Sequence, residues 1–255
     1  MDRRVRARRA TVGRERGRRR AAFALIIVAV IGCTALFLWL RASDVFAVKR
    51  VTATETAHVA VEQIQEATVE ARGVSLLRLS TAGIVAELSA LPYVRTVEVH
   101  RRFPNTLEVE IVEYAPAAGV RTSSGETWLV AEDGRVLQKD GGTKLPLIVA
   151  AGEVSFAPGE CLPATIADAL PLAKLMVERS AVTAGLPAMH HIAVSTGGDL
   201  TVVFEGGTEL RLGPPQELEQ KLMVSESIIE QHLKDGRSLL YVDASVPDRV
   251  AVKAQ

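Results

Sequence analysis

Apolar residues follow three different patterns along the chain, and each pattern predicts a different kind of element. The first pattern is an unbroken apolar run. Residues 21–40 (AAFALIIVAVIGCTALFLWL) contain no charged residue and no proline. As a helix, this run would be about 30 Å long, which is the thickness of the hydrocarbon core of a bilayer. We therefore expect a single transmembrane helix at 21–40.

The second pattern is a strict alternation of apolar and polar residues in the stretch RRFPNTLEVEIVEYAP, residues 101–116. It predicts one arm of a β-hairpin, and YVRTVEVHRRF before it predicts the other arm. The turn is expected at Pro104–Asn105, because proline presets φ and asparagine tolerates left-handed geometry. The side chains expected to face the core are Val97, Val99, Leu107, Val109 and Ile111, whereas Glu98, His100, Glu108 and Glu110 are expected to face water.

Helical spacing of apolar residues precedes this hairpin. Residues 59–69 and 79–92 each place apolar side chains on one helical face, and residues 45–52 predict a short strand. The order strand, helix, helix, strand, strand predicts a small β-α-α-β-β domain over residues 45–115. Two helices would cover the single apolar face of its sheet.

The third pattern fills residues 116–255, where short apolar runs alternate with the turn signals SSGE, EDGR, KDGG, TGGD and EGGT. It predicts an antiparallel β-domain built from hairpins. Two helices are expected to interrupt it, one at 163–181, weakened by Pro171, and one at 214–236. The predicted fold class is therefore α+β: one transmembrane helix, then the β-α-α-β-β domain, then the C-terminal antiparallel β-domain with two helices.

Charge gives the predicted membrane helix a direction. Residues 1–20 carry ten arginines against Asp2 and Glu15, although the whole chain has a formal net charge of zero. The positive-inside rule then keeps this basic tail in the cytoplasm and sends 41–255 across the membrane. A cleaved signal peptide and a nucleic-acid-binding arm are the alternatives. The segment LRASDVF lacks an A-x-A cleavage pattern, and topology with contact to anionic lipids explains the arginines without nucleic acid.

Candidate chemistry is sparse. His190 and His191 are adjacent on an expected strand, so their side chains should point to opposite faces and could bind one metal ion only with distortion. We therefore expect one buried and one exposed histidine. Cys33 and Cys161 lie on opposite sides of the predicted membrane boundary and predict no internal disulfide. We find no nucleophile–base pair, metal motif or nucleotide-binding loop. No catalytic, metal-ligating or cofactor-binding residue is predicted, and binding is favoured over catalysis.

Several stretches in this order resemble the FtsQ/DivIB family of bacterial cell-division proteins. They are RRFPNTLEVEIVEYAPAA, TWLVAEDGRVL, LRLGPPQELEQKLMVSESIIEQ and YVDASVPDRVAVK. The domain at 45–115 resembles a POTRA domain. The resemblance implies a non-enzymatic scaffold of the divisome, without a cofactor, in the cell membrane and enriched at the division septum. It also implies binding to FtsB/DivIC and FtsL, and through them a connection to FtsW and the septal transpeptidase.

Two other functions stay open at this stage. One is a membrane-anchored POTRA-type domain of another envelope assembly or transport system, which should show tandem repeats. The other is a cell-wall enzyme, which would need a convergent polar pocket in the β-domain.

The end of the β-domain holds the candidate binding site. Its last strand is expected at a sheet edge, where unpaired N–H and C=O groups offer a template for an added strand. The resemblance suggests that FtsB/DivIC docks there by β-augmentation, with Arg249 attracting an acidic segment. Alternatively, Tyr241 and Val250 are core residues and Pro247 blunts the edge. The candidate partner-binding residues are Tyr241, Ser245, Val246, Arg249, Val250 and Val252, and the candidate residues of the POTRA hairpin are Arg101, Arg102, Pro104 and Glu113.

Overall fold

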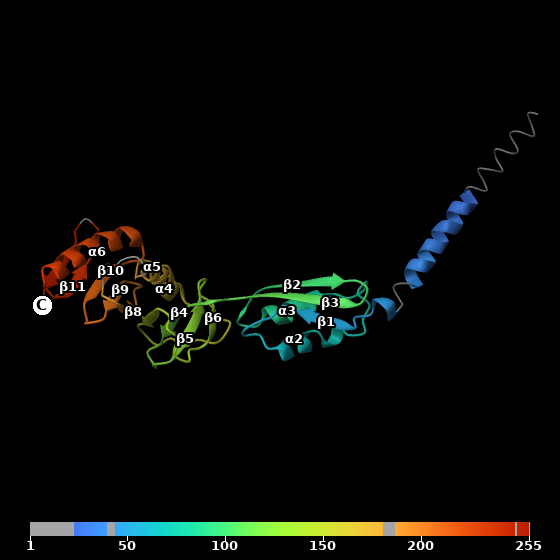
Figure 1. Cartoon of the computed structure of the whole chain (residues 1–255), viewed down its shortest axis with the longest axis horizontal. Helices are drawn as coiled ribbons and strands as arrows, with labels where there is room; N and C mark the ends of the chain where they lie inside the picture. The colour runs from blue at the N-terminus through green and yellow to red at the C-terminus, as the bar shows by residue number, and fades with distance from the viewer. Residues whose placement is uncertain (1–22, 40–43, 181–186, 248, 255) are drawn as a thin grey trace, which may run out of the picture. The chain divides into compact units, whose positions relative to one another are not determined.

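The computed structural model describes residues 23–39, 44–180, 187–247 and 249–254 (Figure 1). Residues 23–39 are helical, and their large apolar side chains are exposed. No helix within these described ranges is both long and apolar enough to cross a membrane. The predicted basic tail and both ends of the predicted 21–40 span lie outside the described residues.

The chain divides into two compact units. The first comprises Met1–Glu55, Ala60–Leu88 and Val97–Ile111, and the second comprises Thr56–Val59, Ser89–Thr96 and Val112–Gln255. A three-stranded sheet in the order β1-β3-β2, with β1 parallel to β3, accompanies two short helices near the start of the chain (Figure 1). Its elements are η1 (Asp44–Phe46), β1 (Arg50–Ala53), α2 (Val61–Ala67), η2 (Val69–Ala71), α3 (Ala82–Ser89), β2 (Val94–Arg102) and β3 (Thr106–Glu113).

The predicted hairpin register is confirmed by burial. Leu107 and Val109 are completely buried and Ile111 is buried. Val97 and Val99 are only half-buried, because β2 is an edge strand and has a neighbour on one side only. The buried apolar side chains contributed by the two helices are Ile64, Ala67, Ile84 and Leu88.

Two details of this region differ from expectation. A 3-10 turn, η1, occupies the beginning of the strand expected at 45–52, so β1 starts only at Arg50. The left-handed backbone expected at Asn105 is absent, since Glu217 is the one non-glycine residue with positive φ in the described chain. The Phe103–Pro104 peptide bond is cis.

The second unit is built on a nine-stranded sheet in the order β12-β11-β10-β9-β8-β7-β4-β5-β6. Glycines with positive φ occupy the predicted turns, for example Gly134 between β5 and β6. The elements are β4 (Pro116–Arg121), β5 (Thr127–Ala131), β6 (Val136–Lys139), β7 (Leu147–Ala150), α4 (Ala164–Ala167), α5 (Leu170–Ser180), β8 (Met189–Val194), β9 (Leu200–Phe204), β10 (Glu209–Gly213), α6 (Leu218–Lys234), β11 (Leu239–Asp243) and β12 (Ala251–Ala254).

The prediction of an antiparallel C-terminal domain is wrong, because the sheet is mixed. The pairs β4–β7, β7–β8 and β10–β11 are parallel. Helices α4 and α5 lie between β7 and β8 in the chain, and α6 lies between β10 and β11. Parallel neighbours need such a crossover, whereas a hairpin can join only antiparallel ones. The turn signals in the sequence indicate hairpins and say nothing about which distant strands pair.

The helix expected at 163–181 is two helices, so the described domain contains three helices and not two. The break falls between α4 and α5. Pro171 is the second residue of α5, where a backbone N–H has no intrahelical acceptor, so proline costs little there. Pro171 therefore correctly indicated that the helical stretch is interrupted, but the break lies before the proline, between α4 and α5.

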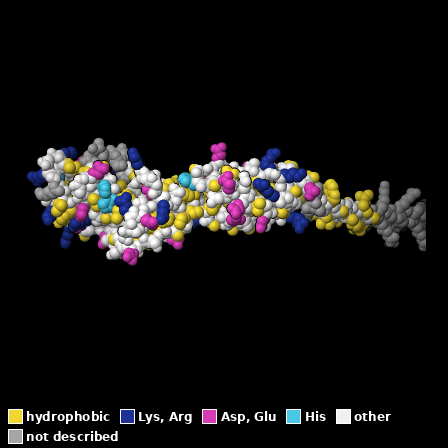
Figure 2. All heavy atoms as spheres, turned by 90° about the horizontal axis from the view of Figure 1, so that it is seen from below, with side chains coloured by type: hydrophobic (Ala, Val, Ile, Leu, Met, Phe, Trp, Pro, Cys, Tyr) yellow, Lys and Arg dark blue, Asp and Glu magenta, His cyan; other side chains and the backbone are white. Residues whose placement is uncertain are grey.

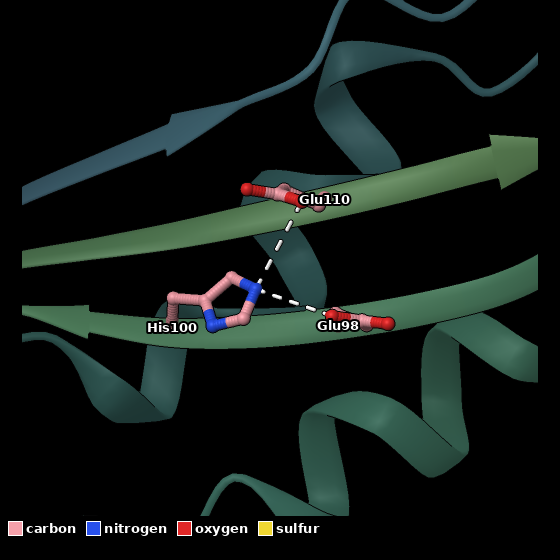
Figure 3. A group of neighbouring side chains, drawn as sticks. All are labelled: Glu98, His100 and Glu110. Carbon is pink, nitrogen blue, oxygen red and sulfur yellow. Dashed lines mark ion pairs between the residues drawn. The ribbon is translucent and has the colours of Figure 1, made fainter.

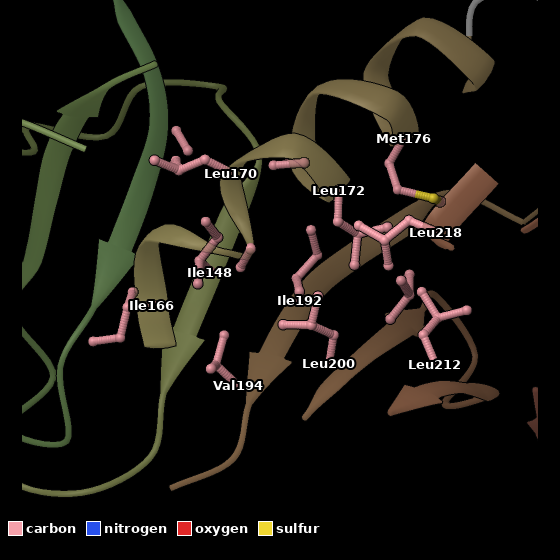
Figure 4. Packing of buried hydrophobic residues seen from close by; sticks show 14 of the residues in the cluster. Ile148, Ile166, Leu170, Leu172, Met176, Ile192, Val194, Leu200, Leu212 and Leu218 are labelled. Atoms are coloured by element: carbon pink, nitrogen blue, oxygen red, sulfur yellow. The ribbon is translucent and has the colours of Figure 1, made fainter. Parts of the chain in front are cut away.

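Helices and strands of the second unit bury a single apolar core (Figure 4). Side chains such as Ile148 and Ile192 on strands meet Leu172 and Leu218 on helices. Helix α6 buries one face, which includes Leu222, Ser225 and Ile229. Leu233, near the end of the helix, is 44% exposed.

A buried lysine ties α6 to the end of β10. The Lys221 ammonium donates to the carbonyl oxygens of Leu212 and Pro214, each at 2.8 Å. Burial lowers the pKa of Lys221, against a smaller opposing effect of Glu217 and Asp199. The two carbonyl bonds replace part of the lost hydration, which allows a cation at this position.

The side chain of Glu113 closes the exit from β3. Within the second unit, its carboxylate accepts hydrogen bonds from the backbone N–H groups of Ala57, His58 and Val59 at 3.0, 3.0 and 2.8 Å. His58 Nδ1 lies 3.2 Å from the same carboxylate. Burial raises the pKa of Glu113, but these hydrogen bonds outweigh burial and hold it below the ordinary value.

We predict that Val109→Asp lowers the free energy of unfolding by about 3–5 kcal/mol, because it buries an unpaired carboxylate. The matched control is Glu108→Ala on the same strand. The Glu108 carboxylate forms an ion pair with Arg102 at 2.5 Å near the surface. Removing this carboxylate should lower the free energy of unfolding by no more than about 1 kcal/mol. Urea denaturation measures both. Equal stability of the two variants would show that the side chains of β3 are assigned to the wrong faces.

We predict that Glu113→Gln destabilises the protein at neutral pH by about 1–3 kcal/mol, because an amide replaces a charged acceptor of several N–H groups. A carboxyl with a depressed folded pKa stabilises the fold above its unfolded pKa of about 4.3, and this stabilisation is lost as the pH falls through the folded pKa. The difference from the wild type should therefore shrink as the pH falls below about 4. Glu153→Gln, at an exposed position, is the control. A pH-independent difference for Glu113→Gln would contradict the assignment.

Candidate partner-binding edge of the sheet

Strand β12 lies at one end of the nine-stranded sheet, as predicted, and every residue in it is exposed. It pairs antiparallel with β11 through Tyr241–Lys253, Val242–Val252 and Asp243–Ala251. Within the described chain, β11 is its sole neighbour in the sheet. One side of its backbone is therefore available to an additional strand.

The pairing of β11 shows which backbone groups of β12 face outward. The N–H of Ala244 donates to the Arg211 carbonyl on β10 at 2.8 Å. Since successive residues alternate, the N–H and C=O groups of Tyr241 and Asp243 point the other way, toward β12. Their partners on β12 point back at them. The N–H and C=O of Val252, which lies between those partners, therefore face the open edge.

The predicted edge residues have different environments. Val252 is 37% exposed and Val246 is 52% exposed. Val250 is half-buried and packs against the core of the second unit, as the alternative interpretation held for it. Arg249 is exposed, and its N–H donates to the Val246 carbonyl at 3.0 Å, which closes the turn before β12.

Ser245 has a local structural contact. Its hydroxyl donates to Asp243 Oδ1 at 2.7 Å, and its N–H donates to the same oxygen at 3.1 Å. A Cβ added at Gly213, which has positive φ, would meet the Cβ of Ser245 at 2.9 Å. The close approach explains why a glycine ends β10 at this point.

Tyr241 is half-buried, like Val250. The Arg211 guanidinium lies 4.4 Å from the centre of its ring, and Glu209 pairs with Arg211 at 2.7 Å. Sequence reasoning missed Arg211 and Glu209 because they are distant from Tyr241 in the chain. The opposite charges two residues apart in ELRLG were the available sign of a Glu209–Arg211 pair. The parallel pairing of β10 with β11 brings this pair next to Tyr241.

The hairpin residues singled out from the sequence make local contacts in their own region. Arg101 donates to the Leu79 carbonyl at 2.8 Å, and Arg102 pairs with Glu108. Pro104 stands in the β2–β3 turn, and Glu113 accepts the backbone bonds described above. Arg101, Arg102 and Glu113 therefore have a structural role in these contacts.

The expectation that His190 and His191 point to opposite faces is wrong, although His190 is exposed and His191 is half-buried. His190 Nδ1 and His191 Nδ1 are 2.7 Å apart, and their rings meet edge to face. The register of β8 against β9 shifts between Met189 and His191, and this irregularity turns adjacent side chains toward each other. Burial lowers the pKa of His191, and His190 and Arg121 lower it further. Arg121 also disfavours a cation at this pair.

Two hollows in the second unit are relevant to the enzyme alternative. One, of about 280 Å³, has a mainly apolar lining that also includes Lys174 and Glu132, which form an ion pair. The other, of about 330 Å³, is lined by Arg95, Tyr114, Ala115, Glu132 and Asp133. Neither lining combines a serine or cysteine nucleophile with a histidine base. Cys161 is exposed and free.

Known proteins match the chain along most of its length. A POTRA domain of the FtsQ type matches residues 46–114, and the C-terminal domain of cell division protein FtsQ/DivIB matches residues 118–245. The cell division protein FtsQ of Anaeromyxobacter sp. is 28% identical over 238 residues, which cover 90% of this chain and 79% of the relative. That of Myxococcus fulvus is 27% identical and covers 72% of this chain and 67% of the relative.

The matched C-terminal domain covers half of the chain and directly follows the matched POTRA domain. The resemblance inferred from the sequence is thereby confirmed. The chain belongs to the FtsQ/DivIB family of bacterial cell-division proteins.

Proposed function

We propose that the protein is a non-enzymatic scaffold of the bacterial divisome, held in the cell membrane by one helix and enriched at the division septum. The observation that carries the proposal is the combination of a POTRA domain of the FtsQ type with an FtsQ/DivIB C-terminal domain, followed by strand β12, whose outer edge is open. A scaffold needs accessible surfaces for binding, and an edge strand provides one with regular hydrogen-bonding geometry.

FtsB/DivIC is the proposed occupant of the β12 edge. Its strand would pair with the outward-facing backbone groups of β12, at about 0.5–1.5 kcal/mol net for each hydrogen bond. Arg249 and Lys253 are exposed at or beside this edge and favour an acidic segment in the partner. FtsL is the second proposed partner, and FtsB/DivIC and FtsL together would connect the scaffold to FtsW and the septal transpeptidase.

The surface charge supports a protein partner over nucleic acid. Basic and acidic side chains are interspersed on the face of the molecule that Figure 2 shows, without a continuous basic stripe. Nucleic-acid binding requires clustered lysine and arginine along the path of the backbone. The ten arginines of residues 1–20 are then explained by membrane topology.

We predict that a reporter active only outside the cytoplasm is active when fused after Gln255 and silent when fused at residue 15. The reason is the arginine block before an uncharged run of 20 residues. Replacing the arginines of residues 1–20 with glutamine should reduce the activity of the Gln255 fusion. Activity at residue 15 together with silence at Gln255 would rule out the proposed orientation.

We predict that Val252→Pro abolishes capture of FtsB/DivIC while the protein still folds. Proline removes the outward N–H of β12 and clashes with an incoming strand, but leaves the inward groups of Ala251 and Lys253 paired with β11. Co-purification of FtsB/DivIC with the full chain measures capture, and thermal unfolding checks the fold.

Val252→Ala is the matched control, because it shortens the same side chain and keeps the N–H. It should retain capture within about threefold, a change of less than 1 kcal/mol. Undiminished capture by a folded Val252→Pro variant would show that FtsB/DivIC does not pair with β12.

A further inference from the structure

Three metal-ligand side chains converge on the solvent face of the first unit. Glu98 and His100 come from β2 and Glu110 comes from β3 (Figure 3). His100 Nε2 lies 3.3 Å from Glu98 Oε2 and 3.8 Å from Glu110 Oε2. The ligand atoms of all three lie within 4.8 Å of one another. The imidazole nitrogen thus points into a space that both carboxylates also reach.

The strand geometry holds these three side chains together. Glu98 and His100 are two residues apart on β2, so they share one face of the sheet. Glu110 projects from the adjacent strand β3 on that face, which is opposite the buried side of Leu107 and Val109. The backbone under this cluster is therefore anchored by the core, while the ligand atoms remain in solvent.

The spacing fits a transition-metal ion after a small adjustment. Ligands about 2.1 Å from a tetrahedral Zn²⁺ are about 3.4 Å apart. The His100–Glu98 distance of 3.3 Å already matches this value, and the His100–Glu110 distance of 3.8 Å is slightly longer. The side chains of Glu98 and Glu110 are 69% and 50% exposed, so rotation about their bonds can close the remaining gap without disturbing the core.

The donor set also selects the class of metal. One imidazole nitrogen with two carboxylates suits Zn²⁺ and related divalent transition metals, whereas Mg²⁺ and Ca²⁺ prefer sets made entirely of oxygen. Two carboxylates balance the charge of a divalent ion. The neighbouring cation on the same face, Arg102, is already paired with Glu108. The exposure of all three side chains leaves room for a water molecule as the fourth ligand.

We propose that Glu98, His100 and Glu110 form a surface site for a divalent transition-metal ion, with Zn²⁺ as the representative ion. A bound ion would link β2 to β3 by a second connection besides their backbone pairing. It would also replace a negatively charged patch on the first unit by a neutral one that keeps an exchangeable coordination position.

The test is a calorimetric titration of the metal-free full chain with Zn²⁺ alone. The titration uses a background in which His190→Gln and His191→Gln remove the other histidine pair. One saturable site is expected. His100→Gln should weaken Zn²⁺ binding at least tenfold, and Glu98→Gln and Glu110→Gln should each weaken it about tenfold or more.

Glu62→Gln is the matched control, because it changes the same residue type at an exposed position of helix α2, outside the cluster, and it should leave Zn²⁺ affinity within about twofold. Zn²⁺ should raise the melting temperature of the background protein and not that of the His100→Gln variant. The absence of saturable Zn²⁺ binding, or an affinity unaffected by His100→Gln, would overturn the proposal and leave an ordinary surface ion pair.

Discussion

The crossover through α6 decides where the sheet of the second unit ends. Strands β10 and β11 are parallel neighbours. After β10, the chain must therefore cross back to the end of the sheet at which β10 began. Helix α6 makes this crossover and buries one of its faces against the core. The Lys221 ammonium fastens this helix to the carbonyls at the end of β10. Strand β11 is thereby placed beside β10, and the hairpin that follows leaves β12 at the end of the sheet with one side of its backbone open.

An open edge is useful only when it does not pair with unintended strands. Strand β12 is four residues long, entirely exposed and carries Lys253, and each of these features discourages unspecific pairing. On the adjoining strands, Tyr241 is held under Arg211, which is held by Glu209. These contacts order the side chains next to the edge, which would reduce the entropy lost if a strand were added there.

The POTRA region uses its polar residues in two ways. Arg101 and Glu113 hold backbone groups of neighbouring segments, so their charges contribute to the fold. Glu98, His100 and Glu110 are instead engaged with one another on the exposed side of the same strands. The alternation of a β-strand allows both uses, since one face is committed to the core and the other can vary without loss of stability.

The sequence by itself determined the local features of this protein. The period-two pattern placed Leu107, Val109 and Ile111 in the core, and the order of motifs identified the family. Four of the five glycine-containing turns located hairpins of the second unit, whereas KDGG joins β6 to β7, which are not neighbours in the sheet. These features depend on neighbours in the chain and are therefore visible in it. Only the tertiary structure decided that three strand pairs of the second unit are parallel, that Arg211 covers Tyr241, that the rings of His190 and His191 meet, and that His100 lies between two carboxylates. Each of these features depends either on the register between segments that are distant in the sequence or on a local irregularity of a strand. The spacing of apolar residues along the chain encodes neither the register nor the irregularity.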